Sequence, residues 1–154
     1  MSALPLVVRA AEPGDAPHLL PLIGAHAQFE GTVASVTLEE LAALLATEQP
    51  PTRIMVAARG GHLLGYAAMT YDFSLWRARI WAHLDCLFVV ETARGQGVGA
   101  HLLDAAITYA RNTKADEIEW QTPLDNAPAI AFYRHHGASS APKMRFKFAL
   151  AHKE

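Results

Sequence analysis

The sequence has only one cysteine, no long apolar run and no excess of basic residues. These features argue against an internal disulfide, a membrane span and a nucleic-acid partner, respectively. Cys86 is the single cysteine, so no internal disulfide can form, and its place in an apolar run favours a buried thiol. No stretch approaches the roughly 18 apolar residues of a membrane span, and the first residues lack the basic start of a signal peptide. Lys and Arg number 13 against 15 Asp and Glu, which leaves no basic surface for nucleic acid. We therefore expect a cytoplasmic protein with no nucleic-acid or membrane partner.

Histidine is better represented, with 8 residues, but its spacing predicts no metal site. No two histidines stand at the i, i+2 or i, i+4 spacing that places two imidazoles on one metal ion. Linkers, repeats and low-complexity segments are also absent, and 154 residues is close to the usual size of one domain. We therefore predict a single domain over residues 1–154 that binds no metal.

A glycine-rich segment is the most informative feature of the chain. Residues 94–99 read R-G-Q-G-V-G, between a strand-like run at residues 82–90 and a helical pattern that begins near Ala100. Glycines allow a sharp turn and a close approach to a ligand, and the first N–H groups of a helix point at negative charge. The segment therefore predicts a binding site for phosphate or pyrophosphate.

Two known kinds of phosphate-binding loop fit the sequence of this segment. Gly95, Gly97 and Ala100 satisfy the fingerprint of dinucleotide-binding folds, and Glu119 stands at the distance of the ribose ligand. That fold needs several further strands and helices, whereas 55 residues follow the loop, which ends at residue 99 of 154. The other pattern is R-x-x-G-x-G at residues 94–99. It resembles the Q/R-x-x-G-x-G/A motif of the Gcn5-related N-acetyltransferases (the GNAT superfamily), which bind the pyrophosphate of acetyl-coenzyme A.

A second motif supports this resemblance. Residues 126–138 read N-A-P-A-I-A-F-Y-R-H-H-G-A, in which Asn126 is a good N-cap and Gly137 a suitable C-cap for one short helix. By helical spacing Tyr133 shares the apolar side with Ile130, which alone favours a core aromatic. Placed after the glycine loop, the segment is similar to the second coenzyme-binding segment of the superfamily. That resemblance implies that Asn126 contacts the coenzyme and that Tyr133 stands beside the thioester sulfur as general acid.

Hydrophobic patterns along the rest of the chain predict the order of strands and helices. Residues 37–40, Thr-Leu-Glu-Glu, form a capping box that opens a helix, and Gly60-Gly61 is a hairpin signal between two strand-like runs. Near the end of the chain, Phe146 and Phe148 alternate with Arg145 and Lys147, which is typical of an edge strand. Strands are expected at residues 4–11, 53–59, 62–71, 79–90, 117–121 and 144–150, and helices after Asp15, after Thr37, at residues 97–111 and at residues 126–137.

This order resembles the GNAT fold over nearly the whole chain. The resemblance implies an α/β (α+β) architecture: a mixed sheet of six to seven strands with splayed central strands, flanked by about four helices. The pantetheine arm of acetyl-coenzyme A then lies between the fourth and fifth strands. The implied backbone contacts with the arm are at Leu87, Phe88 and Val89, and those with the pyrophosphate are at Arg94, Gly95, Gln96, Gly97, Val98, Gly99 and Ala100.

Residues 83–89 read H-L-D-C-L-F-V and narrow the comparison further. They are similar to Y-L-E-D-hydrophobic-aromatic-V in the diamine or spermidine/spermine acetyltransferase branch. The resemblance implies that Asp85 replaces the glutamate that accepts, through water, the proton of the substrate amine. His83 is the other candidate base, because an imidazole exchanges protons near neutral pH. The sequence leaves open which of the two acts, or whether both do.

The acceptor site has fewer acids than expected for a polyamine. Ser74 stands where polyamine enzymes tend to carry an acid, and two arginines nearby add positive charge. We therefore expect a small primary amine such as an amino acid, an amino-acid-like amine or a diamine. An arginine could pair the carboxylate of an amino acid, although either arginine could instead face solvent. The candidate acceptor-binding residues are Glu30, Trp76, Arg77 and Arg79.

These inferences predict an acetyl-coenzyme A-dependent N-acetyltransferase that acts by direct transfer, without a covalent enzyme intermediate. The alternative is a noncatalytic acyl-coenzyme A binding or sensing module, which the replacements at His83, Asp85 and Cys86 motivate. The resemblance also implies a homodimer.

Overall fold

The computed structural model describes residues 2–151, and the chain folds into two compact units, a first that ends at Trp120 and a second that starts at Gln121. The first unit contains, in chain order, β1 (Leu6–Ala10), the 3-10 helix η1 (Pro13–Asp15), α1 (Ala16–Phe29), α2 (Leu38–Ala46), β2 (Arg53–Arg59), β3 (His62–Ser74), β4 (Arg79–Val89), the 3-10 helix η2 (Glu91–Ala93), α3 (Val98–Asn112) and β5 (Ile118–Glu119). The second unit contains α4 (Ala127–His135). The assignment of the chain to one domain stays a prediction.

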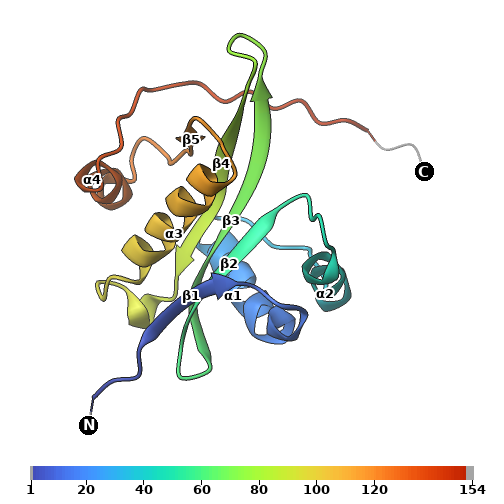
Figure 1. Ribbon diagram of the computed structural model, residues 1–154, viewed down its shortest axis with the longest axis vertical. Helices are drawn as coiled ribbons and strands as arrows, with labels where there is room; N and C mark the ends of the chain where they lie inside the picture. Colours follow the sequence, from blue (N-terminus) through green and yellow to red (C-terminus); the bar gives the residue numbers. More distant parts are fainter. Residues whose placement is uncertain (1, 152–154) are drawn as a thin grey trace. The chain divides into compact units, whose positions relative to one another are not determined.

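The strands form one mixed sheet in the first unit (Figure 1). Their order in the sheet is β1-β2-β3-β4-β5, with antiparallel pairs up to β4 and a parallel pair between β4 and β5. The hairpin between β2 and β3 turns at Gly60 and Gly61, whose φ angles of 58° and 81° suit glycine. The predicted hairpin is therefore confirmed.

Local interactions start the first two helices where the sequence predicts them. Asp15 accepts two hydrogen bonds from Arg9, at 2.7 and 2.9 Å, and so ties β1 to the start of α1. At the start of α2, Thr37 Oγ1 accepts from the Glu40 N–H at 3.1 Å, and Glu40 Oε2 accepts from the Thr37 N–H at 2.8 Å. This reciprocal pair is the capping box that the sequence predicts.

Helices cover both faces of the sheet, with α1 and α2 on one side and α3 on the other (Figure 1). On the first side, fully buried Leu19 and Leu41 pack with Val56, Tyr66 and Phe88 of the strands. We call this side the α1 face. On the second side, α3 buries its apolar stripe against β2, β3 and β4. The residues that it buries are Val98, Leu102, Leu103, Ala106 and Ala110.

The structure corrects the predicted number of strands. The sheet has five strands among residues 2–151, not six to seven, and β5 is shorter than predicted. Residues 144–150 form no strand, and Met144, Phe146 and Phe148 are more than 80% exposed. The alternation of apolar and charged residues was therefore not sufficient to predict a strand at residues 144–150, because a strand is stable only when a neighbouring strand pairs with its backbone. Within the described residues, no helix combines the length and the apolar character needed to cross a membrane.

Candidate functional site

The glycine loop between η2 and α3 takes a conformation suited to binding an anion. Gly95 and Gly97 have φ angles of 76° and 81°, and Gly97 is the N-cap of α3. Helical hydrogen bonding begins where the His101 N–H donates to Gly97 O at 3.1 Å. The N–H groups of residues 98–100 therefore have no acceptor within the helix, and they point out of its positive end. An anionic ligand can bind there.

The side chain of Gln96 braces this loop. Its Oε1 accepts a hydrogen bond from Arg59 Nη1 at 3.1 Å, and its Nε2 donates to Thr92 O at 3.1 Å. His101 Nδ1 lies 2.7 Å from Gly97 O and adds a further contact. These contacts tie the loop to β2 and η2, so its backbone donors are held in place before a ligand arrives.

One edge of β4 is unpaired over the half that leads to this loop. The ladder with β5 ends at His83, and no strand of the described chain continues it. On the other edge, the Val90 N–H donates to the β3 backbone at 2.9 Å. Because backbone groups alternate between the two edges of a strand, Leu87 and Val89 direct theirs to the unpaired edge. We call this the open edge of β4. It offers hydrogen bonds to an extended ligand, as an added strand would use them.

Arg94 connects the open edge to α1. Its Nε donates to Val89 O at 3.0 Å, and its guanidinium lies over the rings of Phe29, at 5.1 Å, and Phe88, at 5.6 Å. The sequence singled out Arg94 and Phe88 but not Phe29. The contact with Phe29 joins residues 65 positions apart (94 minus 29), which no local pattern reveals.

A cavity of about 410 Å³ lies beside these groups. This volume is within the usual range for small-molecule sites, about 300–1,000 Å³. It lies between the second half of α1 and the end of β4. Its walls are formed by Ala25, Gln28, Phe29, Phe88, Val90, Glu91 and Arg94. The open edge, the glycine loop and the cavity therefore form one candidate site in the first unit.

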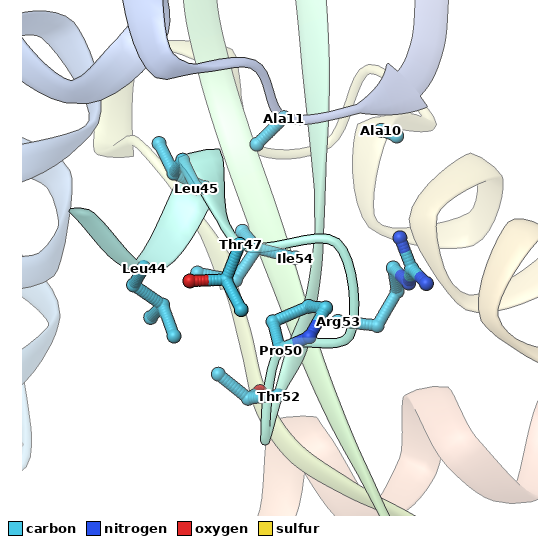
Figure 2. Close-up of a pocket in the computed structure, with 9 residues that line it drawn as sticks. All are labelled: Ala10, Ala11, Leu44, Leu45, Thr47, Pro50, Thr52, Arg53 and Ile54. Atoms are coloured by element: carbon cyan, nitrogen blue, oxygen red, sulfur yellow. The ribbon is translucent and has the colours of Figure 1, made fainter. Parts of the chain in front are cut away.

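A second cavity is not a candidate for substrate binding. It lies between the end of α2 and the start of β2, where Figure 2 shows Leu44, Leu45, Thr47 and Pro50 among its walls. Its volume is about 30 Å³, which is room for one or two water molecules.

Asp85 lies at a β-bulge in β4. Met69 pairs with Leu84 and Ala68 with Cys86, so Asp85 has no partner on β3 and is exposed. Cys86 Sγ donates to Asp85 Oδ2 over 3.7 Å. Burial, and then the Asp85 carboxylate, raises the pKa of the Cys86 thiol to about 12, so the thiol stays protonated at neutral pH.

The second candidate base stands just before the bulge. His83 is partly exposed on β4, opposite Thr70 of β3, and its ring lies 6.3 Å from that of Trp81. Because the bulge adds a residue to β4 between them, the regular two-residue alternation does not hold from His83 to Asp85.

A polar pair beside Asp85 was not predicted from the sequence. His26 Nδ1 on α1 lies 2.6 Å from the Tyr66 hydroxyl on β3, and His26 Nε2 lies 3.9 Å from Glu30 Oε1. Burial lowers the pKa of His26, while Glu30 and Asp85 oppose this shift. The pairing of His26 with Glu30 could have been predicted, because residues four positions apart lie on the same face of a helix. The contact with Tyr66 could not, since it joins residues 40 positions apart.

Tyr133 and Asn126 lie in the second unit. Asn126 caps α4 as predicted, with its Oδ1 accepting from the Ala129 N–H at 3.4 Å and its Nδ2 donating to Thr122 Oγ1 at 3.3 Å. Tyr133 is half-buried, and its ring lies 5.3 Å from that of Phe132. The role of Tyr133 as general acid remains a prediction.

The other predicted acceptor residues lie at the opposite end of β4. Trp76 is 99% exposed in the turn between β3 and β4, and Arg77 pairs with Asp116 at 3.1 Å and with Glu117 at 3.5 Å. Arg79 begins β4, six residues before Asp85, so roughly 20 Å separates the two along the strand. Of the predicted acceptor residues, the structure places only Glu30 next to residues that line the cavity.

Comparisons with known proteins agree with this geometry. The chain is 28% identical over 130 residues to the uncharacterized N-acetyltransferase YhfO of Bacillus subtilis, across 84% of this chain and 87% of that protein. It is 26% identical over 144 residues to the thialysine N-epsilon-acetyltransferase of Bos taurus, across 86% of this chain and 84% of that protein. The crystal structure of the aminoglycoside acetyltransferase meta-AAC0020, from an uncultured soil metagenomic sample, has the same fold. It matches with a TM-score of 0.80 and 21% identity, over 95% of this chain and 97% of that one.

The family assignment rests on a match to a family profile. Residues 25–138, which include the cavity wall of α1, all of β4, the glycine loop and α4, match the sequence profile of the acetyltransferase (GNAT) family. The chain therefore belongs to the acetyltransferase (GNAT) family, and it is an acetyl-coenzyme A-dependent acyltransferase.

Proposed function

We propose that this protein transfers the acetyl group of acetyl-coenzyme A directly to a primary amine of a small molecule. The observation that carries the proposal is the open edge of β4, which runs from Asp85 at the bulge to the glycine loop. An extended thioester bound along this edge would have its phosphates at the positive end of α3 and its acetyl group near Asp85. The reacting groups would then be close to the cavity of about 410 Å³.

The proposed binding of acetyl-coenzyme A uses backbone groups more than side chains. The N–H groups of residues 98–100, at the start of α3, bind the pyrophosphate. The pantetheine arm takes the backbone groups of Leu87 and Val89 that face the open edge. Val89 O already accepts from Arg94, so the arm uses the Val89 N–H rather than this carbonyl.

The proposed chemistry needs a proton acceptor, an oxyanion donor and a proton donor. Asp85, acting through water, or His83 takes the proton of the ammonium so that the free amine can attack the thioester carbonyl. The Leu87 N–H, which faces the open edge, polarises that carbonyl and stabilises the tetrahedral oxyanion. Tyr133 then protonates the departing thiolate. The acetyl group moves in one transfer, and no residue of the protein is acetylated on the way.

Three carboxylates in and near the cavity outnumber Arg94, the one cation among the described residues of its wall, and so favour a cationic acceptor. Glu91 lines the cavity, Glu30 follows its wall residue Phe29, and Asp85 lies at the nearby bulge. The Bos taurus relative acts, by its name, on the epsilon nitrogen of thialysine, which is an amine on a small amino-acid-like molecule. We propose that the acceptor is an amino acid, an amino-acid-like amine or a diamine. Neither arginine is proposed to bind the carboxylate of an amino acid, because Arg79 lies roughly 20 Å from Asp85 along β4 and Arg77 already pairs with two carboxylates.

The experiment that tests the proposal is thiol release from acetyl-coenzyme A in the presence of a panel of amines. The panel contains polyamines, lysine analogues, other amino acids and simple amines, and a thermal-shift titration with coenzyme A runs alongside. Turnover with a small primary amine supports the proposal. Stabilisation by coenzyme A without turnover of any amine supports the alternative, a binding or sensing module. A lack of both would contradict the proposed site.

A second experiment assigns the base. Asp85→Asn and His83→Gln are compared across pH, each with the best amine of the panel. The variant that loses the acid limb of the kcat/KM profile identifies the proton acceptor. A profile that neither change alters would rule out both residues.

A further inference from the structure

A chain of polar contacts crosses the α1 face and ends at the proposed base. His26 Nδ1 lies 2.6 Å from the Tyr66 hydroxyl, and the Cys86 thiol packs against the cluster that contains Tyr66, where burial and then the thiol raise the pKa of the hydroxyl. Cys86 Sγ in turn lies 3.7 Å from Asp85 Oδ2. The chain thus joins helix α1 to the bulge of β4 through three side-chain contacts.

The hydroxyl at the centre of this chain is not required for packing. Tyr66 is 3% exposed and lies in an apolar cluster with Leu19, Leu22 and Ile54. A polar group in such surroundings costs free energy unless it is hydrogen-bonded, and phenylalanine would fill nearly the same space without that requirement. The polar contacts of Tyr66 therefore suggest a role beyond filling the core.

His26 lies directly behind the wall of the cavity. Its ring stacks on that of Phe88 with a centroid distance of 5.0 Å and an interplanar angle of 20°. Phe88 lines the cavity, and so do Ala25 and Gln28 on the same helix as His26. A change in the charge of His26 is therefore a change in the charge just behind the proposed acceptor site.

The ionisable groups around His26 come from each element that packs against it. Glu30 is the C-cap of α1, Tyr66 lies on β3, and Asp85 and Cys86 lie on β4. The cation Arg94 contacts the rings of Phe88 and Phe29. Burial lowers the pKa of His26 and the two carboxylates raise it, with burial the larger effect. The imidazole is therefore mainly neutral at neutral pH.

We propose that His26 is a positioning residue that acts on Asp85 through Tyr66 and Cys86, and that its neutral form keeps Asp85 ready to accept a proton. The inference rests on the proposed role of Asp85 as base. The heavy atoms of the chain allow two directions of hydrogen bonding, because the hydroxyl and thiol hydrogens rotate freely.

The direction depends on the charge of the imidazole. When His26 is neutral, the Tyr66 O–H donates to Nδ1, so the Cys86 sulfur accepts no hydrogen bond from Tyr66 and its S–H donates only weakly to Asp85, over 3.7 Å. When His26 is protonated, Nδ1–H donates to Tyr66 and Tyr66 donates to Cys86, which polarises the thiol and strengthens its hydrogen bond to Asp85. That hydrogen bond and the added positive charge both stabilise the carboxylate and make it a weaker proton acceptor.

The kinetic test compares kcat/KM between pH 5 and pH 9 for the wild type, His26→Asn and Tyr66→Phe. Asparagine keeps a polar group near the position of Nδ1 but does not titrate, and Tyr66→Phe interrupts the chain while His26 remains. The wild type should lose about tenfold more activity than either variant between pH 8 and pH 5, as expected for one additional coupled ionisation. A purely structural role would lower activity equally at every pH, and that outcome would overturn the proposal.

A second readout needs no substrate and separates this inference from the proposed function. The imidazole of His26 is titrated by NMR in the full chain, with Asp85→Asn as the test variant and Asp104→Asn, on the exposed side of α3, as the control. Asp85 favours the protonated imidazole, so its neutralisation should move the midpoint of His26 to lower pH, and Asp104→Asn should not. An unchanged midpoint in Asp85→Asn would show that the two residues are not coupled, whether or not any amine is acetylated.

Discussion

At the scale of single residues, Asp15 stabilises the junction between the first strand and the first helix. It accepts two hydrogen bonds from Arg9 and one from the Glu12 N–H at 2.7 Å. The bonds from Arg9 lower the pKa of Asp15, and this effect outweighs the opposing effect of burial. A carboxylate with this many donors is stabilised in its ionised form, so its contribution to folding depends on pH.

We predict that Asp15→Asn lowers the free energy of unfolding by about 2 kcal/mol at pH 7, because charged hydrogen bonds to Arg9 are lost. The folded-state pKa lies below the unfolded one, so the contribution is complete above the unfolded value and disappears as the pH falls through the folded value. Urea unfolding at pH 7 and at pH 3 measures this. The difference between wild type and variant should be smaller at pH 3.

The control for this experiment is Asp104→Asn, which alters an exposed carboxylate of α3. It should change the free energy of unfolding by less than about 0.5 kcal/mol at both pH values. An effect as large as that of Asp15→Asn would mean that net charge, rather than the contact with Arg9, determines stability.

Tyr133→Phe tests the proposed proton donor. The change removes one hydroxyl and keeps the ring, so the affinity for coenzyme A should be retained while kcat falls by roughly two to four powers of ten if chemistry limits turnover. Steady-state kinetics and a coenzyme A titration measure the two effects. Tyr109→Phe is the matched control, because Tyr109 lies on α3 beside Tyr71 and Arg53 and has no proposed role. Unchanged turnover in Tyr133→Phe would remove this residue from the mechanism.

At the scale of elements, the start of α3 determines how the phosphates are held. Gly97→Ala places a side chain at a φ of 81°, which costs roughly 1–2 kcal/mol in the left-handed region and changes the turn that orients the first N–H groups. We predict that affinity for coenzyme A falls by about tenfold or more. Isothermal titration measures this in the folded protein.

Gly24→Ala is the matched control for Gly97→Ala. Gly24 lies in the exposed part of α1, and an added Cβ there would meet no atom within 4 Å. The change should raise the free energy of unfolding by about 0.5–1 kcal/mol and leave binding of coenzyme A unaltered. Equal binding by the Gly97→Ala variant and the wild type would contradict the proposed role of the loop.

Signals that lie close together in the sequence predicted the elements well. The capping box at Thr37 and Glu40, the hairpin at Gly60-Gly61 and the helix after the glycine loop are all confirmed. Each depends on neighbouring residues, whose spacing the sequence displays directly. The strand predicted at residues 144–150 was wrong, because its formation depends on a partner strand that a periodic pattern does not identify.

The candidate site could be predicted only in part, for the same reason. Arg94, the glycines and Asp85 could be found because they belong to short motifs. The contact between His26 and Tyr66 could not be found in this way, since the two residues meet only after α1 folds onto β3. The bulge at Asp85 also could not be predicted from the sequence, because it depends on the register between β3 and β4 rather than on either strand alone.

At the scale of the whole molecule, the association state is a separate prediction. The resemblance to acetyltransferases implies a homodimer, and sedimentation equilibrium over a range of protein concentrations tests it. We expect twice the chain mass of 16.7 kDa. A single species of one chain mass at every concentration would contradict the prediction without affecting the proposed chemistry.

The proposed function depends on where acetyl-coenzyme A binds. Amide hydrogen exchange with and without coenzyme A tests this most directly, since each proposed contact is a backbone N–H. We predict slower exchange at Leu87, at Val89 and at residues 98–100, and no change in β1 or β2. Protection confined to other elements, or no protection while thiol is still released, would contradict the proposed site at the open edge of β4.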